Sequence, residues 1–333
     1  MKQERILYLD ITKFVAICLV CIGHAYYLTI GTESNVRSII YLFHMPLFMI
    51  ISGFFSINSF KLPFIPFIKA KAKQLLLPFI TFYVILSLYH IIICHFVIDI
   101  NMLIEIAIAL LWFLKTLFIC YLIVYLFKRL KNIPDIYLAI TTSLLFIIIP
   151  KGYIMSINSL LPMFWTGYFC RKYIIEGGSF KWWITPLSSV IFGFCTLFYF
   201  KNPTLYMPFT YKLLINYPLL IAYEYLIGLT GSFTIIGIVM FFSKKYGNNY
   251  ILTKLGDIGK YTLGIFVMQF FLIEQIGRMF FKITPISRAD FPLYDYIVSP
   301  LIGIVGLLIS YSFVLILSKI KIVNLLFFGG QYS

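Results

Sequence analysis

Long apolar runs, each near the length that crosses a bilayer, constrain the fold of this chain most. They follow one another with only short polar joints, and a membrane-spanning helix needs about 20 apolar residues. Inside a bilayer the backbone must satisfy its own hydrogen bonds, so each run is expected to be an α-helix. We therefore predict an all-α, multi-pass helical bundle that forms one integral-membrane domain over residues 1–333. Ten spans are expected, at about residues 7–28, 36–57, 75–97, 102–127, 135–150, 154–173, 182–200, 219–243, 257–281 and 294–318.

The charged residues favour a membrane protein with one preferred orientation. Only 12% of the 333 residues are charged and 61% are hydrophobic, whereas about a quarter of a soluble domain is charged. Of the 27 Lys and Arg residues, 18 lie in joints on the side of the N-terminus and six in joints on the other side. Because cytoplasmic loops carry the excess of Lys and Arg, both termini are expected in the cytoplasm. The net charge of +15 therefore predicts contact with a lipid bilayer and not with a nucleic acid.

The first span carries three ionisable residues inside its apolar run: Asp10, Lys13 and His24. A charge at membrane depth costs at least ~2.5–3.5 kcal/mol on insertion scales, so such residues usually face a partner or a water-filled cavity. Eleven positions of helix place Lys13 and His24 within roughly 20° of one face and about 16 Å apart along it. We interpret this helix face, which we call the stripe, as the candidate functional region of the protein. Asp10, three positions before Lys13, could also be its structural ion-pair partner.

A candidate catalytic group is expected in the outer half of the bundle, where His24, His44 and Glu224 converge. A histidine with a carboxylate is the minimum set that activates a hydroxyl by general-base catalysis. A structural role remains open for His44, which could satisfy backbone groups freed by Pro46, and Glu224 could be a hydrogen-bonded buried acid. His24, His44 and Glu224 could also bind a metal ion, but none of the three lies at i, i+3 or i, i+4 from another, so no metal site is predicted. We expect the molecule that carries this hydroxyl, the acceptor, to contact Trp112, Lys115 and Gln269.

The basic joint at about residues 58–74 allows two interpretations. Its lysines could anchor the chain to anionic lipid headgroups, at about 1 kcal/mol for each basic residue near the surface. They could instead bind a phosphorylated cytosolic ligand, because Lys is a common phosphate-binding residue. Such a ligand would be held jointly by this joint and by the inner end of the first span. The residues expected to hold it are Arg5, Asp10, Lys13, Lys69, Lys71 and Lys73.

Two motifs resemble those of a known family. The pattern R-x4-D-x2-K-x10-H at residues 5–24 resembles the first-helix signature of acyltransferase family 3, the multi-spanning membrane O-acyltransferases. The pattern FHMPLF-x3-SGF at residues 43–54 is similar to the second-helix motif, especially that of the fucose 4-O-acetylase-like branch. Weaker similarities in the family order are K-x3-LP at residues 73–78, LWFL at 111–114 and LG-x2-G-x2-TLGI at 255–265.

The resemblance implies transfer of an acetyl or other short acyl group from cytoplasmic acyl-CoA to a hydroxyl of a surface polysaccharide or a lipid-linked sugar. Acetyl-CoA would be a donor substrate, with no permanently bound cofactor, and the location would be a bacterial cytoplasmic membrane. His24 corresponds to the essential histidine of the family and Lys13 to its basic partner. Lys lacks the bidentate fork of the commoner Arg. Gln269 stands where relatives often have His, so no proton-transfer role is assigned to it.

A transporter or flippase for a lipid-linked glycan is the alternative function. Such a protein also needs charged groups inside the membrane and a central cavity. Transporters often carry inverted repeats, and we find no repeat in this sequence. Binding of acyl-CoA would separate the two classes.

Overall fold

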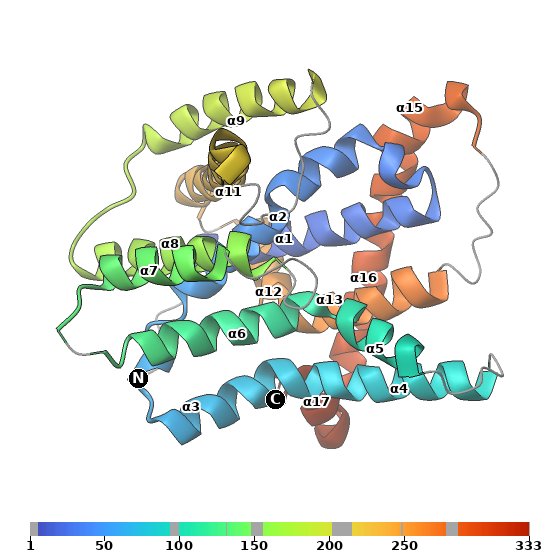
Figure 1. The fold of residues 1–333 in the computed structure, drawn as a ribbon. Helices are drawn as coiled ribbons and strands as arrows, with labels where there is room; N and C mark the ends of the chain where they lie inside the picture. Colours follow the sequence, from blue (N-terminus) through green and yellow to red (C-terminus); the bar gives the residue numbers. More distant parts are fainter. Residues whose placement is uncertain are drawn as a thin grey trace.

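The computed structural model describes residues 6–93, 100–130, 132–147, 156–201, 215–247, 249–277 and 286–332. These residues are helical throughout their regular parts and contain no strand, so the all-α prediction is confirmed. Figure 1 shows α6 lying between the α7–α8 pair and the helix that runs from α3 into α4, with α1 and α2 side by side above α6. The helices of the first half are α1 (Leu7–Ala25), α2 (Asn35–Phe54), α3 (Phe64–Lys71), α4 (Leu77–Ile93), α5 (Ile100–Ala109), α6 (Trp112–Phe127), α7 (Asp135–Ile147) and α8 (Ile157–Ile175).

The second half of the described chain packs around α1 and α2. Helix α11 packs between α9 and α2, while α12, α13 and α16 pack against α1. A π-helical segment, η6 (Phe270–Gly277), continues α13, and another, η4 (Ala72–Leu76), joins α3 to α4. The remaining helices are α9 (Ile184–Lys201), α11 (Pro218–Lys245), α12 (Tyr250–Gly259), α13 (Thr262–Gln269), α15 (Phe291–Leu293), α16 (Ser299–Leu317) and α17 (Lys321–Phe328).

By length and composition, six of the described helical stretches could cross a membrane, and a seventh if α5 and α6 form one broken span. Helix α8 and the shorter helices α7 and α13 with η6 fall within the other three expected spans but do not qualify. In α8 the polar residues Asn158, Arg171 and Lys172 interrupt the apolar run. The count of ten and the cytoplasmic termini therefore stay predictions. The six stretches are Leu7–Leu28, Asn35–Phe54, Phe64–Tyr89, Ile184–Lys201, Pro218–Lys245 and Phe291–Leu317.

Two glycines let α2 and α8 approach each other at backbone distance. A Cβ built on Gly53 would lie 1.9 Å from the carbonyl oxygen of Phe164, and one built on Gly167 would lie 1.9 Å from that of Ile50. Between apolar helices in a membrane there is little hydrophobic driving force, so close contact of small residues supplies much of the attraction. This crossing fixes α2, and with it His44, against the segment that carries Asn158.

The chain turns sharply between α5 and α6. The two helices meet at an angle of 66°, and Leu111 at the corner has the left-handed φ of 43°. The Nζ atom of Lys115 donates hydrogen bonds to the carbonyl oxygens of Ala107 and, at 2.9 Å, Ile108. These carbonyls belong to the last turn of α5 and have no partner within that helix. Lys115 therefore stabilises the turn.

The basic segment near residue 69 is helical, which differs from the polar joint expected at residues 58–74. Helix α3 begins at Phe64 and runs through η4 into α4 as one candidate span, Phe64–Tyr89. Lys69 and Lys73 are exposed, whereas Lys71 is buried. Long lysine side chains can follow apolar surface and still bring the ammonium group to a polar environment. The lysines were therefore a poor guide to where the helix begins.

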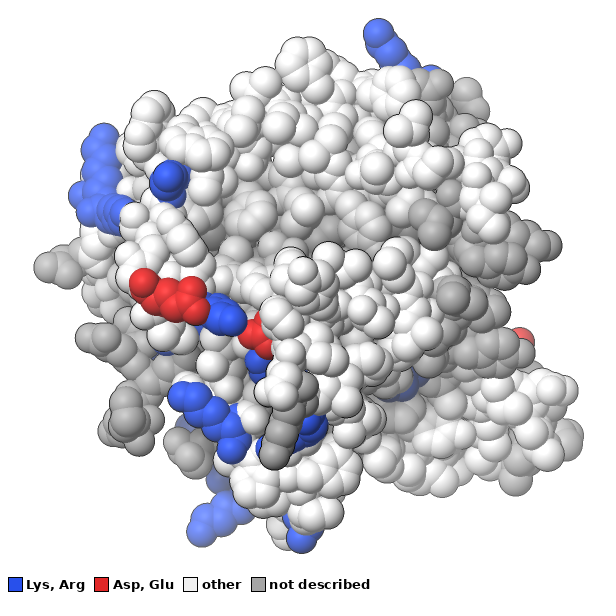
Figure 2. Space-filling model, turned by 60° about the vertical axis from the view of Figure 1, so that its left-hand side comes forward, with Lys and Arg blue, Asp and Glu red and all other residues white. Residues whose placement is uncertain are grey.

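Charge is unevenly distributed on the surface. Figure 2 shows Lys and Arg side chains mostly over the left and lower parts of the visible face, while most of the remainder carries no charge. Apolar residues exposed on α9 and α16, such as Phe194 and Leu301, fit a surface that contacts lipid tails. A basic region beside an apolar surface is the distribution that the expected orientation requires.

Candidate functional site

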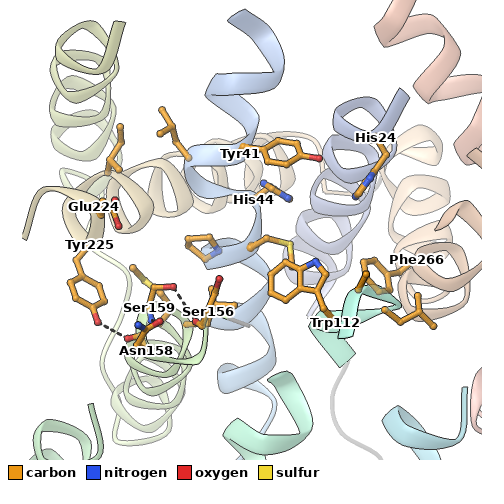
Figure 3. A pocket seen from close by; sticks show the side chains of 18 of the residues that line it. His24, Tyr41, His44, Trp112, Ser156, Asn158, Ser159, Glu224, Tyr225 and Phe266 are labelled. Carbon is orange, nitrogen blue, oxygen red and sulfur yellow. Dashed lines mark hydrogen bonds between the residues drawn. The ribbon is translucent and has the colours of Figure 1, made fainter. Parts of the chain in front are cut away.

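A cavity of about 380 Å³ lies between the helices and brings together five of the six residues predicted from sequence for catalysis or acceptor binding. We call it the His24 cavity. Figure 3 shows His24 on one side, His44 and Trp112 near the centre, and Glu224 on the far side. The five residues come from α1, α2, α6, α11 and α13: His24, His44, Trp112, Glu224 and Gln269.

His24 is paired with a carboxylate that sequence reasoning missed. The Nδ1 atom of His24, in the last turn of α1, lies 2.8 Å from the Oε1 atom of Glu274 in η6, an ion-pair distance. Both atoms are buried, and the contact has the distance of an ion pair without the geometry of a hydrogen bond. A carboxylate can only accept, so the proton between them belongs on Nδ1 when the imidazole is neutral. The Nε2 atom is then the basic nitrogen, and this arrangement suits a general base.

His44 is held by its own helix. Its Nδ1 atom lies 2.8 Å from the carbonyl oxygen of Ile40, and its ring is 4.7 Å from that of Tyr41 between centroids. A carbonyl accepts only, so Nδ1 carries the proton. Pro46 frees the carbonyl of the residue four positions before it, Leu42, so the backbone group that His44 binds is not the one that Pro46 leaves open. Its side chain instead lines the His24 cavity.

Glu224 lies across the cavity from His24 among residues suited to hydrogen-bond a polyol (Figure 3). Its neighbour Tyr225 donates a hydrogen bond of 2.7 Å to the carbonyl oxygen of Asn158, which ties α11 to the start of α8. Ser159 and the Asn158 amide line the same end. Aromatic rings beside hydroxyl, amide and carboxylate groups can bind both faces and edges of a sugar.

Lys115 does not line either of the two cavities described here. Its ammonium group is occupied by the carbonyls of Ala107 and Ile108 at the end of α5. Trp112, three residues earlier, does line the His24 cavity. Of the three residues expected to contact an acceptor, the cavity therefore brings together Trp112 and Gln269.

A second cavity, of about 230 Å³, lies at the other end of the α1 stripe. We call it the Lys13 cavity. Lys13 Nζ lies 3.0 Å from Asp10 Oδ1 and 4.2 Å from the centroid of the Phe55 ring. The paired ammonium is thus fixed at the edge of an aromatic cavity. Polar residues that share this lining, and that sequence reasoning missed, are Gln74, Lys260 and Gln331.

Not all of the other residues expected to bind a donor lie close to the Lys13 cavity. Lys71 is buried behind it, with Nζ 3.8 Å from the centroid of the Tyr121 ring and 3.4 Å from Gln74 Oε1, and both partners line the cavity. Lys69 and Lys73 are exposed outside it. Asp10 is buried and pairs with Lys13. Arg5 lies outside the described residues.

The segment after α17 covers one side of the Lys13 cavity. Gln331 lines the cavity, and the hydroxyl of Tyr332 accepts a hydrogen bond of 2.9 Å from the backbone N–H of Gly264 in the first turn of α13. Burial raises the pKa of Tyr332 above its usual value, so the hydroxyl stays neutral. The contact therefore holds this segment to α13 without placing a charge there.

One aromatic residue separates the two cavities. Phe266 is the single described residue that lines both. Its ring packs edge-to-face on Phe113 with centroids 5.9 Å apart, and Phe113 in turn contacts Phe48 at 5.8 Å and Trp112 at 6.1 Å. The Lys13 and His24 ends of the α1 stripe thus open into two spaces that meet at a wall of rings.

Comparison with known proteins assigns the family. A family model described as an acyltransferase domain matches residues 6–319. The chain belongs to acyltransferase family 3. No curated protein and no solved structure matched the chain. Membership makes this chain a membrane acyltransferase and favours acyl transfer over the transporter alternative. The match does not distinguish branches, so the likeness to fucose 4-O-acetylases remains an expectation.

In the described parts of the chain, no group of three or more His, Cys, Asp or Glu side chains is placed to hold a metal ion. Two of the residues that sequence reasoning missed, Glu274 and Lys260, carry charge in the cavity walls. Glu274 had a signal, because it is a carboxylate inside the ninth apolar run. Lys260 had none, since it appeared as one more basic residue in a joint.

Proposed function

We propose that this membrane acyltransferase moves an acetyl or other short acyl group from acyl-CoA to a hydroxyl of a surface-polysaccharide or lipid-linked sugar. The observation that carries the proposal is the His24–Glu274 pair, with Nδ1 and Oε1 2.8 Å apart at the wall of a cavity that also holds polyol-binding groups. An oriented imidazole beside hydroxyl-binding side chains is what hydroxyl activation requires.

The donor would occupy the Lys13 cavity. Lys13 and Lys260 would contact the phosphates of acyl-CoA, and the buried Lys71 would add positive charge behind them. The pantetheine arm would follow the α1 stripe, whose two ends lie about 16 Å apart along the helix. Exposed Lys69 and Lys73, with Arg5, would extend the basic surface by which a polyanionic donor approaches.

The acceptor would occupy the His24 cavity. Trp112 offers an aromatic face to a sugar ring, and Glu224, Asn158 and Ser159 offer hydrogen bonds to its hydroxyl groups. His44 shapes the cavity beside His24. Glu224, predicted as part of the catalytic group, is here assigned to acceptor binding, because Glu274 is the carboxylate in contact with His24.

The reaction is a direct acyl transfer. His24 Nε2 takes the proton of the sugar hydroxyl as the hydroxyl oxygen attacks the carbonyl carbon of the thioester. A carbon–oxygen bond forms, the carbon–sulfur bond breaks, and the departing sulfur takes the proton from His24. Glu274 holds the ring so that Nε2 faces the substrate and stabilises the imidazolium formed in between.

The test is an acyl-transfer assay with purified protein in detergent. Labelled acetyl-CoA is supplied with and without a set of cell-surface glycans, and wild type is compared with His24→Gln and His44→Gln. We expect transfer by wild type, at least a ~100-fold loss in His24→Gln, and a smaller loss in His44→Gln, since His44 Nδ1 is bonded to its own helix. Acyl transfer at wild-type rate by His24→Gln would reject the mechanism. Wild-type protein that neither binds nor turns over any acyl-CoA would reject the proposed function.

A further inference from the structure

Gln269 is a buried amide whose side chain has no hydrogen-bond partner in the described part of the chain. The side chain is 0% exposed, it lines the His24 cavity, and among the described residues neither Oε1 nor Nε2 makes a hydrogen bond. Buried polar groups are almost always hydrogen-bonded, so an exception in a cavity wall calls for an explanation. An apolar side chain of the same length would pack equally well there. The amide therefore fits a group that enters the cavity.

The position of Gln269 identifies that group. Gln269 follows Phe266 by three residues, which places it on the same side of α13 and about 4.5 Å further along the axis. Phe266 lines both cavities, whereas Gln269 lines the His24 cavity alone. An acyl group that reaches His24 from the Lys13 cavity must pass Phe266 and then meets Gln269.

The start of α6 adds positive potential at the same place. Leu111 and Trp112, at the first turn of α6, both line the His24 cavity. The N-terminus of a helix carries a partial positive charge that favours an anion. The hydroxyl-binding groups Asn158, Ser159 and Glu224 lie at the other end of the cavity (Figure 3). The end near Phe266 therefore suits developing negative charge, and the far end suits a sugar.

We propose that Gln269 is a catalytic residue that donates a hydrogen bond from Nε2 to the thioester carbonyl oxygen. This inference rests on the proposed acyl transfer. When the hydroxyl oxygen bonds to the carbonyl carbon and His24 takes the proton, the carbonyl π pair moves onto oxygen. Gln269 holds that oxyanion until the pair returns, the carbon–sulfur bond breaks and the thiolate takes the proton from His24. A neutral amide donor keeps this capacity at every pH at which His24 is a base.

The first test replaces the amide with an apolar side chain of similar length, Gln269→Met. We expect kcat to fall by about 10²- to 10³-fold, the usual effect of removing one oxyanion donor. The KM values for acyl-CoA and acceptor should change by less than about 3-fold, because the lost interaction forms only in the transition state. The melting temperature should stay equal or rise, because an unpartnered buried amide has been removed.

The matched control is Gln275→Met. Gln275 is the same residue type in the adjoining segment η6, and it lines neither cavity. This variant should keep the wild-type kcat. Gln269→Glu, which keeps the shape but offers a carboxylate in place of the amide donor, should lose kcat as Gln269→Met does.

A spectroscopic measurement separates this role from a structural one. Acetyl-CoA with a ¹³C-labelled carbonyl is bound in the His24→Ala background, and its carbonyl stretch is recorded with and without Gln269→Met. A hydrogen bond from Gln269 should place the stretch at lower frequency when Gln269 is present. Equal frequencies, full kcat in Gln269→Met, or a raised acceptor KM at unchanged kcat would each overturn the inference.

The outcome also distinguishes the inference from the proposed function. Wild-type turnover that needs His24 but not Gln269 overturns the oxyanion role alone. Absence of any acyl-CoA binding and turnover in wild type overturns the proposed function and this inference with it.

Discussion

The Oε1 atom of Glu274 lies 2.8 Å from the Nδ1 atom of His24, where the end of α1 meets the π-helical segment η6. The contact joins the first apolar run of the chain to the ninth. It fixes which nitrogen of the imidazole carries the proton, and therefore which nitrogen acts as the base toward the cavity. The site accordingly depends on the packing of α13 and η6 against α1 as much as on His24 itself.

Glu274→Gln should lower kcat by about 10²- to 10⁴-fold with little change in either KM, because an amide can turn its N–H toward Nδ1 and favour the wrong tautomer. Steady-state kinetics of acyl transfer measure this effect. Glu176→Gln, an exposed carboxylate after α8, is the matched control and should behave as wild type. If Glu274→Gln kept more than a tenth of the wild-type kcat, the pair would be structural only.

Lys13→Met should raise the KM for acyl-CoA by about 10-fold, equivalent to 1.4 kcal/mol, with a smaller effect on kcat. The lost ammonium lies at the wall of the proposed donor cavity. Because the change also leaves buried Asp10 without this partner, the double variant Asp10→Asn/Lys13→Met should recover stability but not donor affinity.

Donor binding to both variants can be measured by calorimetry in detergent. Lys181→Met, an exposed lysine after α8 and outside both cavities, should bind acyl-CoA as wild type does. Unchanged acyl-CoA affinity in Lys13→Met would remove the donor from the Lys13 cavity.

Lys115→Met should destabilise the fold by about 1–3 kcal/mol, because two carbonyl groups at the end of α5 lose the donor that satisfies them. The acceptor KM should not change in the fraction that stays folded. Thermal unfolding in detergent measures the stability, and acceptor titration measures the KM. Lys201→Met, at the exposed end of α9, is the control. Normal stability with a raised acceptor KM would return Lys115 to the acceptor site.

Gly167→Ala should destabilise the protein by about 1–3 kcal/mol or more, because the new methyl would stand 1.9 Å from the carbonyl oxygen of Ile50 and must push α2 and α8 apart. Gly193→Ala is the matched control: it lies in α9 with no atom within 4 Å of the added Cβ, so its stability should be unchanged or slightly higher. Melting temperatures of the two variants give the comparison. Equal melting temperatures would mean that α2 and α8 can move apart with little loss of stability.

Sequence periodicity and charge predicted the helical membrane fold and five of the residues that line the His24 cavity. His24, His44, Glu224 and Gln269 were found because polar groups inside apolar runs are costly, and all four line one cavity together with Trp112. A charged or polar residue inside an apolar run is visible in the sequence itself. Which buried groups then contact each other depends on packing between distant helices, and this information is absent from any single run.

Two backbone irregularities explain why Glu274 was missed and why Lys115 lies outside the cavity where it was expected. In a regular α-helix, Gln269 and Glu274 would point about 140° apart, but η6 changes the register after Gln269 and lets both line the His24 cavity. Likewise Trp112 and Lys115 share a face in a straight helix, yet the 66° turn at Leu111 brings the carbonyls of α5 within reach of Lys115. Neither a π-helical segment nor a left-handed leucine has a sequence signature that would have predicted it.

The wall formed by Phe266 gives the fold an electrical property. Phe266 lines both cavities, so if the two cavities hold water and open to opposite faces of the bilayer, its ring is part of the low-dielectric layer between them. Much of any voltage across the membrane would then fall over that ring instead of over the full bilayer. An acyl group is uncharged and crosses such a narrow field without electrical work, whereas an ion or a CoA phosphate does not. If the proposed acyl transfer takes place, the reactive group would pass this ring while ions would not.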